Sequence, residues 1–202
     1  LYRMGTHTPW IVRWPSCVKA GAVNDRHMIS GVDFMPTILD ALGLPQPTGM
    51  DGRSFLPLLE GREQPNREEV YTVFQVTSAN KEFPSRCIQT PRYGYIYNSW
   101  PDGKTEFKNE AAGGKACKAM EAAAEQSPLI TERIRFFRLR TTEELYDYQT
   151  DPFAQKNLAA SPEHAGLVRT MRERMHETMK STGDPTLESF EKFMASQKTA
   201  VP

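Results

Sequence analysis

Apolar and polar residues alternate along this chain in blocks that predict short strands and a few amphipathic helices. Near the start, residues 9–14 are mostly apolar and stop at Pro15, which is typical of a short buried strand. A loop follows as far as Asn24. The first part of the chain therefore begins with a strand that we expect to lie inside a sheet.

The next apolar residues recur at steps of four and three positions, as they do on one face of a helix. Pro36 lies inside this stretch, where it would break a continuous helix. We therefore expect Asp33 to cap a fresh helix with Pro36 in its first turn, and Gly43 to end that helix. The predicted apolar face consists of Met28, Val32, Met35, Leu39 and Leu42.

Further along, the pattern changes to short β-rich runs separated by turn residues, which predicts an antiparallel hairpin or meander. Residues 105–126 are rich in Ala, Lys and Glu and indicate a helix or a mobile insertion. Residues 129–139 favour a second short helix. The predicted strands are residues 70–76, 87–90, 93–97 and 144–148.

The clearest helix lies near the end of the chain. Ser161 is a capping residue, and Pro162 suits the first helical position. Gly183 and Pro185 end the helix. Four apolar residues share one face of it, which we interpret as core packing; they are Val168, Met171, Met175 and Met179.

These patterns divide the chain into two main parts. Residues 1–61 are predicted to be the end of an α/β core. Residues 70–185 are predicted to form an α+β unit with a small antiparallel sheet packed by a helix. Residues 62–69 are polar and indicate a linker, while residues 186–202 are poorly patterned and predict a peripheral tail.

Charge and composition narrow the class of protein. Lys plus Arg and Asp plus Glu both number 25, so no overall field favours nucleic acid or an anionic membrane. No apolar run approaches the ~18 residues that a membrane helix needs. We therefore predict neither a nucleic-acid partner nor a membrane partner. A local basic patch for a sulfated sugar stays compatible with this balance.

The three cysteines are Cys17, Cys87 and Cys117. Their odd number and irregular spacing argue against a disulfide framework. Two alternatives stay open. Either one disulfide forms and one thiol is free, or all three thiols are buried. None lies in a Cys-x-x-Cys motif or a Cys/His cluster, so we predict no structural zinc site, and we name no metal ligand within the chain.

The first residues carry a turn that runs from Tyr2 through Gly5 and His7 to Pro9, followed by the apolar run. This turn resembles the sulfatase pattern Tyr-x-x-Gly-x-(Arg/His)-x-Pro, which precedes a buried strand. In that family the turn lies just after the last metal ligands, at the edge of the active site. The resemblance implies that the chain is the C-terminal portion of a larger sulfatase.

Two further motifs occur in family order. Residues 29–44 and 52–59 resemble the Val-Asp-x-x-Pro-Thr-Ile-Leu helix of sulfatases and its Gly-x-Ser-Leu-x-Pro-Leu-Leu continuation. Residues 144–158 match the signature Glu-Leu-Tyr-Asp-x-x-x-Asp-Pro-x-Glu-x-x-Asn-Leu, with Gln at the second Glu. We interpret this last motif as a turn closed by Asp147 and Asp151, without a catalytic residue.

The resemblance identifies the chain as a member of the formylglycine-dependent sulfatases of the alkaline-phosphatase superfamily, closest to sulfamidase-like bacterial enzymes. It implies the end of an alkaline-phosphatase-like α/β core followed by the smaller sulfatase sheet. The family uses Ca²⁺ and a formylglycine made from Cys or Ser. Neither the modification motif nor the metal-binding Asp-Asn pair occurs here, so both cofactors are expected upstream and this fragment alone is expected to be inactive.

Two residues are candidates for substrate binding. His7 lies where the family carries Arg or His, and its alternative role is a turn histidine that bonds the backbone. Arg86 lies in a Phe-Pro-Ser-Arg segment that resembles the Tyr-Pro-x-Arg of sulfamidases. It can pair with a sulfate or carboxylate, and its alternative role is an ion pair that joins the two domains.

The expected function is hydrolysis of a sulfate ester, or of an N-sulfate, in a sulfated carbohydrate, as in glycosaminoglycan degradation. The resemblance implies a periplasmic or secreted protein, which can also form an oligomer. Two alternatives stay open. One is a phosphodiesterase or phosphonate hydrolase of the same superfamily, and the other is a non-catalytic module for substrate binding or assembly.

Overall fold

The computed structural model describes residues 1–199. Its centre is an antiparallel sheet whose four strands are neighbours in space in the same order as in the chain, so the sheet is a meander. All the predicted strands of this region are confirmed, with the second extended toward its N-terminal end. The strands are β1 (Val70–Val76), β2 (Glu82–Gln89), β3 (Tyr93–Asn98) and β4 (Glu143–Asp147).

The register gives the sheet two buried faces. Ile88 pairs with Tyr95, and Cys87 pairs with Ile96. Because neighbouring side chains of a strand point to opposite faces, these pairs build two separate clusters. A sheet that is buried on both sides must be covered by further elements on each side.

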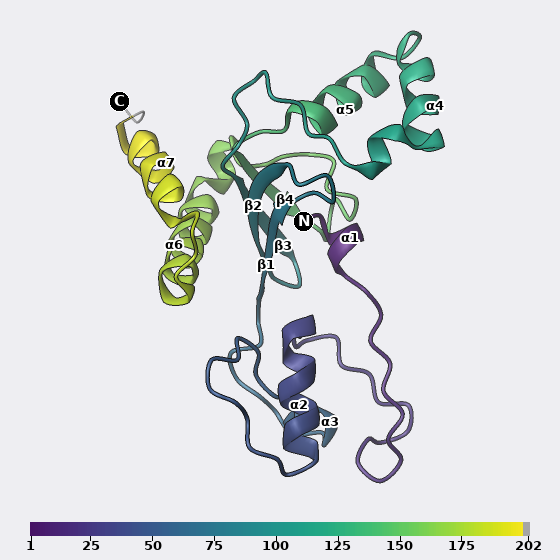
Figure 1. Ribbon diagram of the computed structural model, residues 1–202, viewed down its shortest axis with the longest axis vertical. Helices are drawn as coiled ribbons and strands as arrows, with labels where there is room; N and C mark the ends of the chain where they lie inside the picture. Colours follow the sequence, from purple (N-terminus) through teal and green to yellow (C-terminus); the bar gives the residue numbers. More distant parts are fainter. Residues whose placement is uncertain (200–202) are drawn as a thin grey trace.

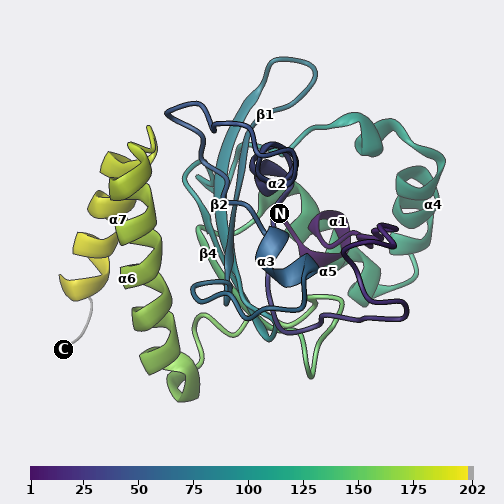
Figure 2. The ribbon, with the colours of Figure 1, turned by 90° about the horizontal axis from the view of Figure 1, so that it is seen from below.

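Helices α6 (Ala165–Thr182) and α7 (Leu187–Thr199) cover one face of the sheet, as Figures 1 and 2 both show. A short 3₁₀ turn, Pro162–His164, precedes α6, and Gly183 ends it with a left-handed backbone. The four apolar residues predicted to share a face of this helix are all buried against the sheet.

The predicted peripheral tail is wrong for residues 187–199, which form α7. Phe190 is fully buried, and its ring lies 4.7 Å from that of Tyr97. Phe193 and Met194 pack on the same cluster. These three residues form an apolar stripe too short to stand out from the polar residues around it. Residues 200–202 of the predicted tail lie outside the described residues.

The opposite face of the sheet is covered by the first residues of the chain and by the insertion between β3 and β4 (Figure 2). Of the two alternatives given for residues 105–126, the structure shows the helical one from Glu110 onward, and the short helix predicted at residues 129–139 is confirmed. The elements on this side are α1 (Arg3–Thr6), the 3₁₀ turn η2 (Glu110–Gly113), α4 (Lys115–Ala124) and α5 (Pro128–Leu139).

A separate lobe contains the 3₁₀ turn η1 (Gly31–Asp33), α2 (Phe34–Ala41) and α3 (Leu56–Leu59) (Figure 1). The helix starts after Asp33 and ends before Gly43, as predicted. The Asp33 carboxylate, however, makes no cap bond to the helix. It pairs with the buried guanidinium of Arg67 at 2.5 Å, which is a stronger partner than a neutral N–H.

The predicted buried strand at residues 9–14 is wrong. These residues form no strand, and Ile11 is 91% exposed. Most of the predicted apolar face in and around α2 is exposed as well, with Val32, Met35 and Leu42 each more than half exposed. The backbone of a strand needs a neighbour for its N–H and C=O groups. Within residues 1–199 no strand lies beside this segment, so the lobe keeps an unpartnered apolar side.

Within residues 1–199, no helix has the length and apolar character needed to cross a membrane.

Candidate functional site

A buried carboxylate holds the first turn of the chain against the sheet. Glu144 of β4 is fully buried. Its Oε2 accepts hydrogen bonds from the hydroxyls of Tyr2 at 2.5 Å and Tyr146 at 2.6 Å, and its Oε1 accepts one from Asn98 Nδ2 at 2.8 Å. A buried charge is tolerated when its oxygens are satisfied in this way.

The pKa values of the two tyrosine hydroxyls are shifted upward from their ordinary value. Burial raises the pKa of Tyr2 and of Tyr146, and the negative charge of Glu144 raises both further. Each phenol therefore stays protonated, as a donor to Glu144, well above physiological pH.

Arg140 completes the network from the end of α5. Its Nη1 donates to the Tyr2 hydroxyl at 2.5 Å, and its guanidinium lies 4.8 Å above the centre of the Tyr2 ring. Phe136, Phe137 and Phe107 surround the same cation at 5.3–5.6 Å. A guanidinium is stabilised by aromatic faces at this range.

Further bonds fix the turn at the end of β2 and at the β2–β3 connection. Gln89 Nε2 donates to Thr6 Oγ1 at 2.6 Å and to the Leu1 carbonyl at 3.3 Å. Arg3 donates to the carbonyl of Pro91 at 3.0 Å. The segment that resembles the edge of a sulfatase active site is thus positioned by residues more than 80 positions away.

His7, a predicted substrate contact, lies just after the turn that these bonds hold in place. Its backbone N–H donates to the Arg3 carbonyl at 2.8 Å, so it closes α1. Its side chain is exposed, and no described residue hydrogen-bonds to its ring. The turn is therefore held by backbone, and the imidazole is left free for a further contact.

Arg86, the second predicted contact, is 1% exposed. Its Nε and Nη2 form a two-pronged pair with the Asp184 carboxylate at 2.6 and 2.9 Å, and Nη2 also donates to Thr186 at 2.7 Å. The geometry favours an ion pair for this residue, but the pair lies within residues 70–185 and does not join the two predicted domains. The pair joins β2 to the connection between α6 and α7.

The motif at residues 144–158 forms a closed turn, as predicted. Asp151 Oδ2 accepts the backbone N–H groups of Gln155 and Lys156, and Asn157 Oδ1 accepts that of Leu145. The sequence interpretation missed the role of Glu144. A Glu in an apolar strand, followed two positions later by Tyr on the same face, was the available signal.

The described residues do not fit the family's cofactors. No group of three or more His, Cys, Asp or Glu side chains among residues 1–199 is arranged to hold a metal ion. Cys87 is fully buried, and burial raises the pKa of its thiol to about 12. Residues 1–199 therefore supply no metal site, and Cys87 is not a reactive thiolate, so we derive no step through either group.

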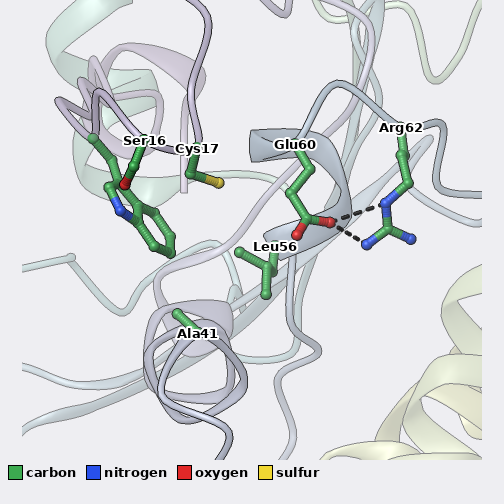
Figure 3. Close-up of a pocket in the computed structure, with 7 residues that line it drawn as sticks. Ser16, Cys17, Ala41, Leu56, Glu60 and Arg62 are labelled. Atoms are coloured by element: carbon green, nitrogen blue, oxygen red, sulfur yellow. Dashed lines mark hydrogen bonds and ion pairs between the residues drawn. The ribbon is translucent and has the colours of Figure 1, made fainter.

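Two hollows on the surface lie beside the N-terminal segment. One, of about 650 Å³, is open and lies between the loop after the first residues and helices α2 and α3 (Figure 3). Its only charged lining residues, Glu60 and Arg62, pair with each other. The other, of about 220 Å³, lies beside Tyr2 and Arg140 and is walled by aromatic rings.

Comparison with known proteins identifies the class. The profile of the family described as "N-sulphoglucosamine sulphohydrolase, C-terminal" matches residues 1–107, more than half of the chain. The chain therefore belongs to this family of sulfatase C-terminal regions, which confirms the resemblance in its motifs.

Individual relatives agree with this assignment. The chain is 33% identical to an ulvan-active sulfatase of Formosa agariphila over 183 residues, covering 90% of this chain and 34% of that protein. It is 26% identical to human N-sulphoglucosamine sulphohydrolase over 199 residues, covering 92% of this chain and 39% of that protein. The chain spans about a third of the length of the curated relatives it matches.

The fold is shared with solved sulfatase structures. One was solved in complex with its substrate D-glucosamine-2-N,6-O-disulfate; it superimposes with a TM-score of 0.57 at 21% identity, over 87% of this chain and 28% of that one. The predicted combination of an α/β part and a helix-packed antiparallel sheet is thereby confirmed.

Proposed function

We propose that this chain is the C-terminal part of a sulfatase that hydrolyses sulfate esters, or an N-sulfate, of a sulfated carbohydrate. The observation that carries the proposal is the family match across residues 1–107, which includes the clamped turn at Tyr2. Residues 1–61 would complete the catalytic α/β core. Residues 62–69 would link it to the sheet subdomain at residues 70–185.

In this proposal the chain positions the substrate and the edge of the active site, while the rest of the enzyme supplies the reacting groups. Both cofactors would be held by residues outside this chain. Formylglycine would supply the nucleophile, and Ca²⁺ would neutralise the sulfate oxygens. Glu144 and Arg140 hold the Tyr2 turn at the edge of that site. His7, exposed and free, faces the substrate and contacts its sulfate. Arg86 supports the site indirectly, through the ion pair that fixes β2.

The substrate class follows from the relatives, whose names include ulvan and N-sulphoglucosamine. A sulfated carbohydrate is the substrate class that both names share. Polymeric sulfated carbohydrates lie outside the cytoplasm, so we propose a periplasmic or secreted location.

The test is a sulfate-release assay on the protein expressed from its complete reading frame. The substrates are ulvan oligosaccharides, glucosamine N-sulfate, glucosamine 6-sulfate and, as the alternative chemistry, a phosphonate monoester. Release of sulfate from at least one sugar, with slower or absent phosphonate cleavage, is the expected result. Phosphonate cleavage alone would move the enzyme to phosphorus chemistry. Binding of sulfated sugar without turnover would favour the binding-module alternative.

A matched control is the chain of residues 1–202 alone. It should release no sulfate from any of these substrates, because it contains neither the nucleophile nor the metal ligands. Turnover by this fragment would contradict the division of labour proposed above.

A further inference from the structure

The cavity of about 220 Å³ lies where the first residues, the sheet and the β3–β4 insertion meet. Phe74, Trp100, Phe107 and Phe137 form its apolar walls. Trp100 and Phe107 are stacked, with ring centres 5.9 Å apart, so this wall is a continuous aromatic surface. Pockets for drug-sized ligands are about 300–1,000 Å³, so this one suits a single ring.

Arg140 brings a positive charge to this cavity. The open hollow of Figure 3 offers a comparison, because its arginine, Arg62, is neutralised by Glu60. Among the described residues, no carboxylate lies within 4.0 Å of the Arg140 guanidinium. It is linked to the negative charge of Glu144 through the Tyr2 hydroxyl, which accepts from Arg140 and donates to Glu144.

Most of the hydrogen-bonding capacity of Arg140 is unused. A guanidinium has five N–H donors. One hydrogen bond, to Tyr2, is present within the described part of the chain. The remaining donors of a half-buried cation favour an anionic partner that can take two of them at once.

The backbone at Arg140 is held in a conformation that L-residues rarely adopt. Its φ is +52°, in the left-handed region. Such a residue persists only when the surroundings fix it, and strain of this kind clusters at binding sites. Here the strained residue is the one that directs a cation toward the cavity.

A second polar group lines the same cavity without a partner. Asn109 Oδ1 is buried and accepts no hydrogen bond within the described residues. Buried carbonyl oxygens are normally satisfied. A ligand hydroxyl would satisfy this one, while the aromatic wall would take the apolar face of the ring.

We propose that this cavity is a subsite for one sugar ring that carries an oxyanion group, with Arg140 as the anion-binding residue and Asn109 as a hydroxyl acceptor. The oxyanion is a sulfate or a carboxylate, which present the same paired oxygens to a guanidinium. The proposal that an anionic sugar binds here rests on the cavity alone. The further point that the ring belongs to the substrate, next to the sulfate that is removed, rests on the proposed function.

The experiment is calorimetric titration of the protein expressed from its complete reading frame. The probes are N-acetylglucosamine 6-sulfate, glucuronate and uncharged N-acetylglucosamine, with product formation monitored by chromatography. The variants are Arg140→Met, Arg140→Lys and Asn109→Asp. The matched control is Arg138→Met, which removes an arginine of the same helix that is paired with Glu121 at 2.5 Å.

We expect Arg140→Met to weaken the Kd of at least one anionic sugar about tenfold or more and to leave that of N-acetylglucosamine unchanged, because only the charge-assisted bonds are lost. The Kd of Arg140→Lys should lie between those of the parent and Arg140→Met, since lysine keeps the charge without the paired donors. Arg138→Met should bind like the parent. Whether the sulfate or the carboxylate probe responds identifies the oxyanion.

An unchanged Kd for both anionic sugars in a folded Arg140→Met protein would overturn the proposal, as would an equal loss for all three sugars. If Arg140→Met does not fold, Asn109→Asp decides, because a carboxylate in the cavity should repel the anionic probes selectively and a uniform effect would overturn the subsite. Sulfate release by the parent protein is measured separately. Its absence with selective anion binding intact would refute the proposed function alone.

Discussion

The hydroxyl of Tyr2 donates to Oε2 of Glu144 at 2.5 Å, although the two residues are 142 positions apart. This bond joins the first turn of the chain to the last strand of the sheet. The same carboxylate accepts from Tyr146 and Asn98, so one buried charge organises both the turn and the sheet surface beneath it. A change at Glu144 should therefore affect residues that are far from it in sequence.

Glu144→Gln is expected to destabilise the protein by about 1–3 kcal/mol, because a neutral amide would place donors against the hydroxyls of Tyr2 and Tyr146 and leave buried groups unsatisfied. Urea unfolding measures the change as a lower midpoint. Glu132→Gln, on the exposed side of α5, is the control and should keep the parent midpoint. Equal midpoints for the two variants would contradict the role assigned to the network.

The Arg86–Asp184 pair predicts a loss of stability in acid. Burial pushes the pKa of Asp184 upward, but hydrogen bonds from Arg86 and from the Thr186 N–H outweigh it and hold the pKa below its ordinary value of 3.8. A carboxyl with a lowered folded pKa stabilises fully above its unfolded pKa, and the effect fades as the pH falls through the folded value.

When unfolding midpoints are measured between about pH 2 and pH 7, they should therefore decrease as the pH drops below about 4. Asp184→Asn should flatten this part of the curve. Arg86→Met should lower the free energy of unfolding near pH 7 by about 3–5 kcal/mol, because it leaves a buried carboxylate unpaired. The unfolding midpoint should fall accordingly. Acid curves of the same slope for parent and Asp184→Asn would assign the acid loss to other groups.

The three thiols should differ in reactivity. All three are free; Cys87 is buried with a pKa of about 12, while Cys17 and Cys117 are partly exposed. Because the thiolate is the reactive form, Cys87 should resist a thiol reagent near pH 8 in the native protein and react only after unfolding. Ellman titration with and without denaturant checks this. Rapid native labelling of Cys87 would mean that the strand opens.

Gly94→Ala is expected to disrupt the sheet face that carries the turn. A Cβ at Gly94 would lie 1.8 Å from the Tyr148 hydroxyl, and that ring is buried and has little room to move. Overpacking of this kind costs about 1–3 kcal/mol. Gly166→Ala in α6 is the matched control. It meets no atom within 4 Å and should be neutral or stabilising, by up to about 1 kcal/mol.

His7→Ala should lower kcat/KM for a sulfated sugar about tenfold in the protein expressed from its complete reading frame, if its free ring contacts the sulfate. The unfolding midpoint should stay unchanged, since the side chain is exposed and bonds no described residue. His176→Ala, which removes only a surface pair with Glu191, is the control. A shifted midpoint with unchanged kcat/KM would favour the turn-histidine alternative.

The sheet subdomain could be predicted from sequence because its signals are local. The strand at Val70–Val76 has the bounds that the β-rich run indicated, and the methionine stripe of α6 lies in the core. Periods of two and of three to four residues reflect burial directly when an element packs along its whole length.

The remaining features depend on contacts that no local pattern contains. Arg86 could be read as a ligand for sulfate until the structure placed Asp184, 98 residues later, against it. The strand predicted at residues 9–14 needed neighbouring strands that residues 1–199 do not supply. Glu144, Tyr2 and Arg140 meet only because the sheet and α5 bring them together.

The bond between Tyr2 and Glu144 also sets an order of events during synthesis. A ribosome adds about 5–20 residues per second, so the 142 positions between them take roughly 7–28 seconds to make. For that time the Tyr2 hydroxyl lacks its native partner Glu144, and the fourth strand of the sheet does not yet exist. The turn nearest the proposed catalytic centre is therefore completed late, after β4 has left the ribosome, and a nascent chain stalled before Glu144 should keep that turn open to a protease.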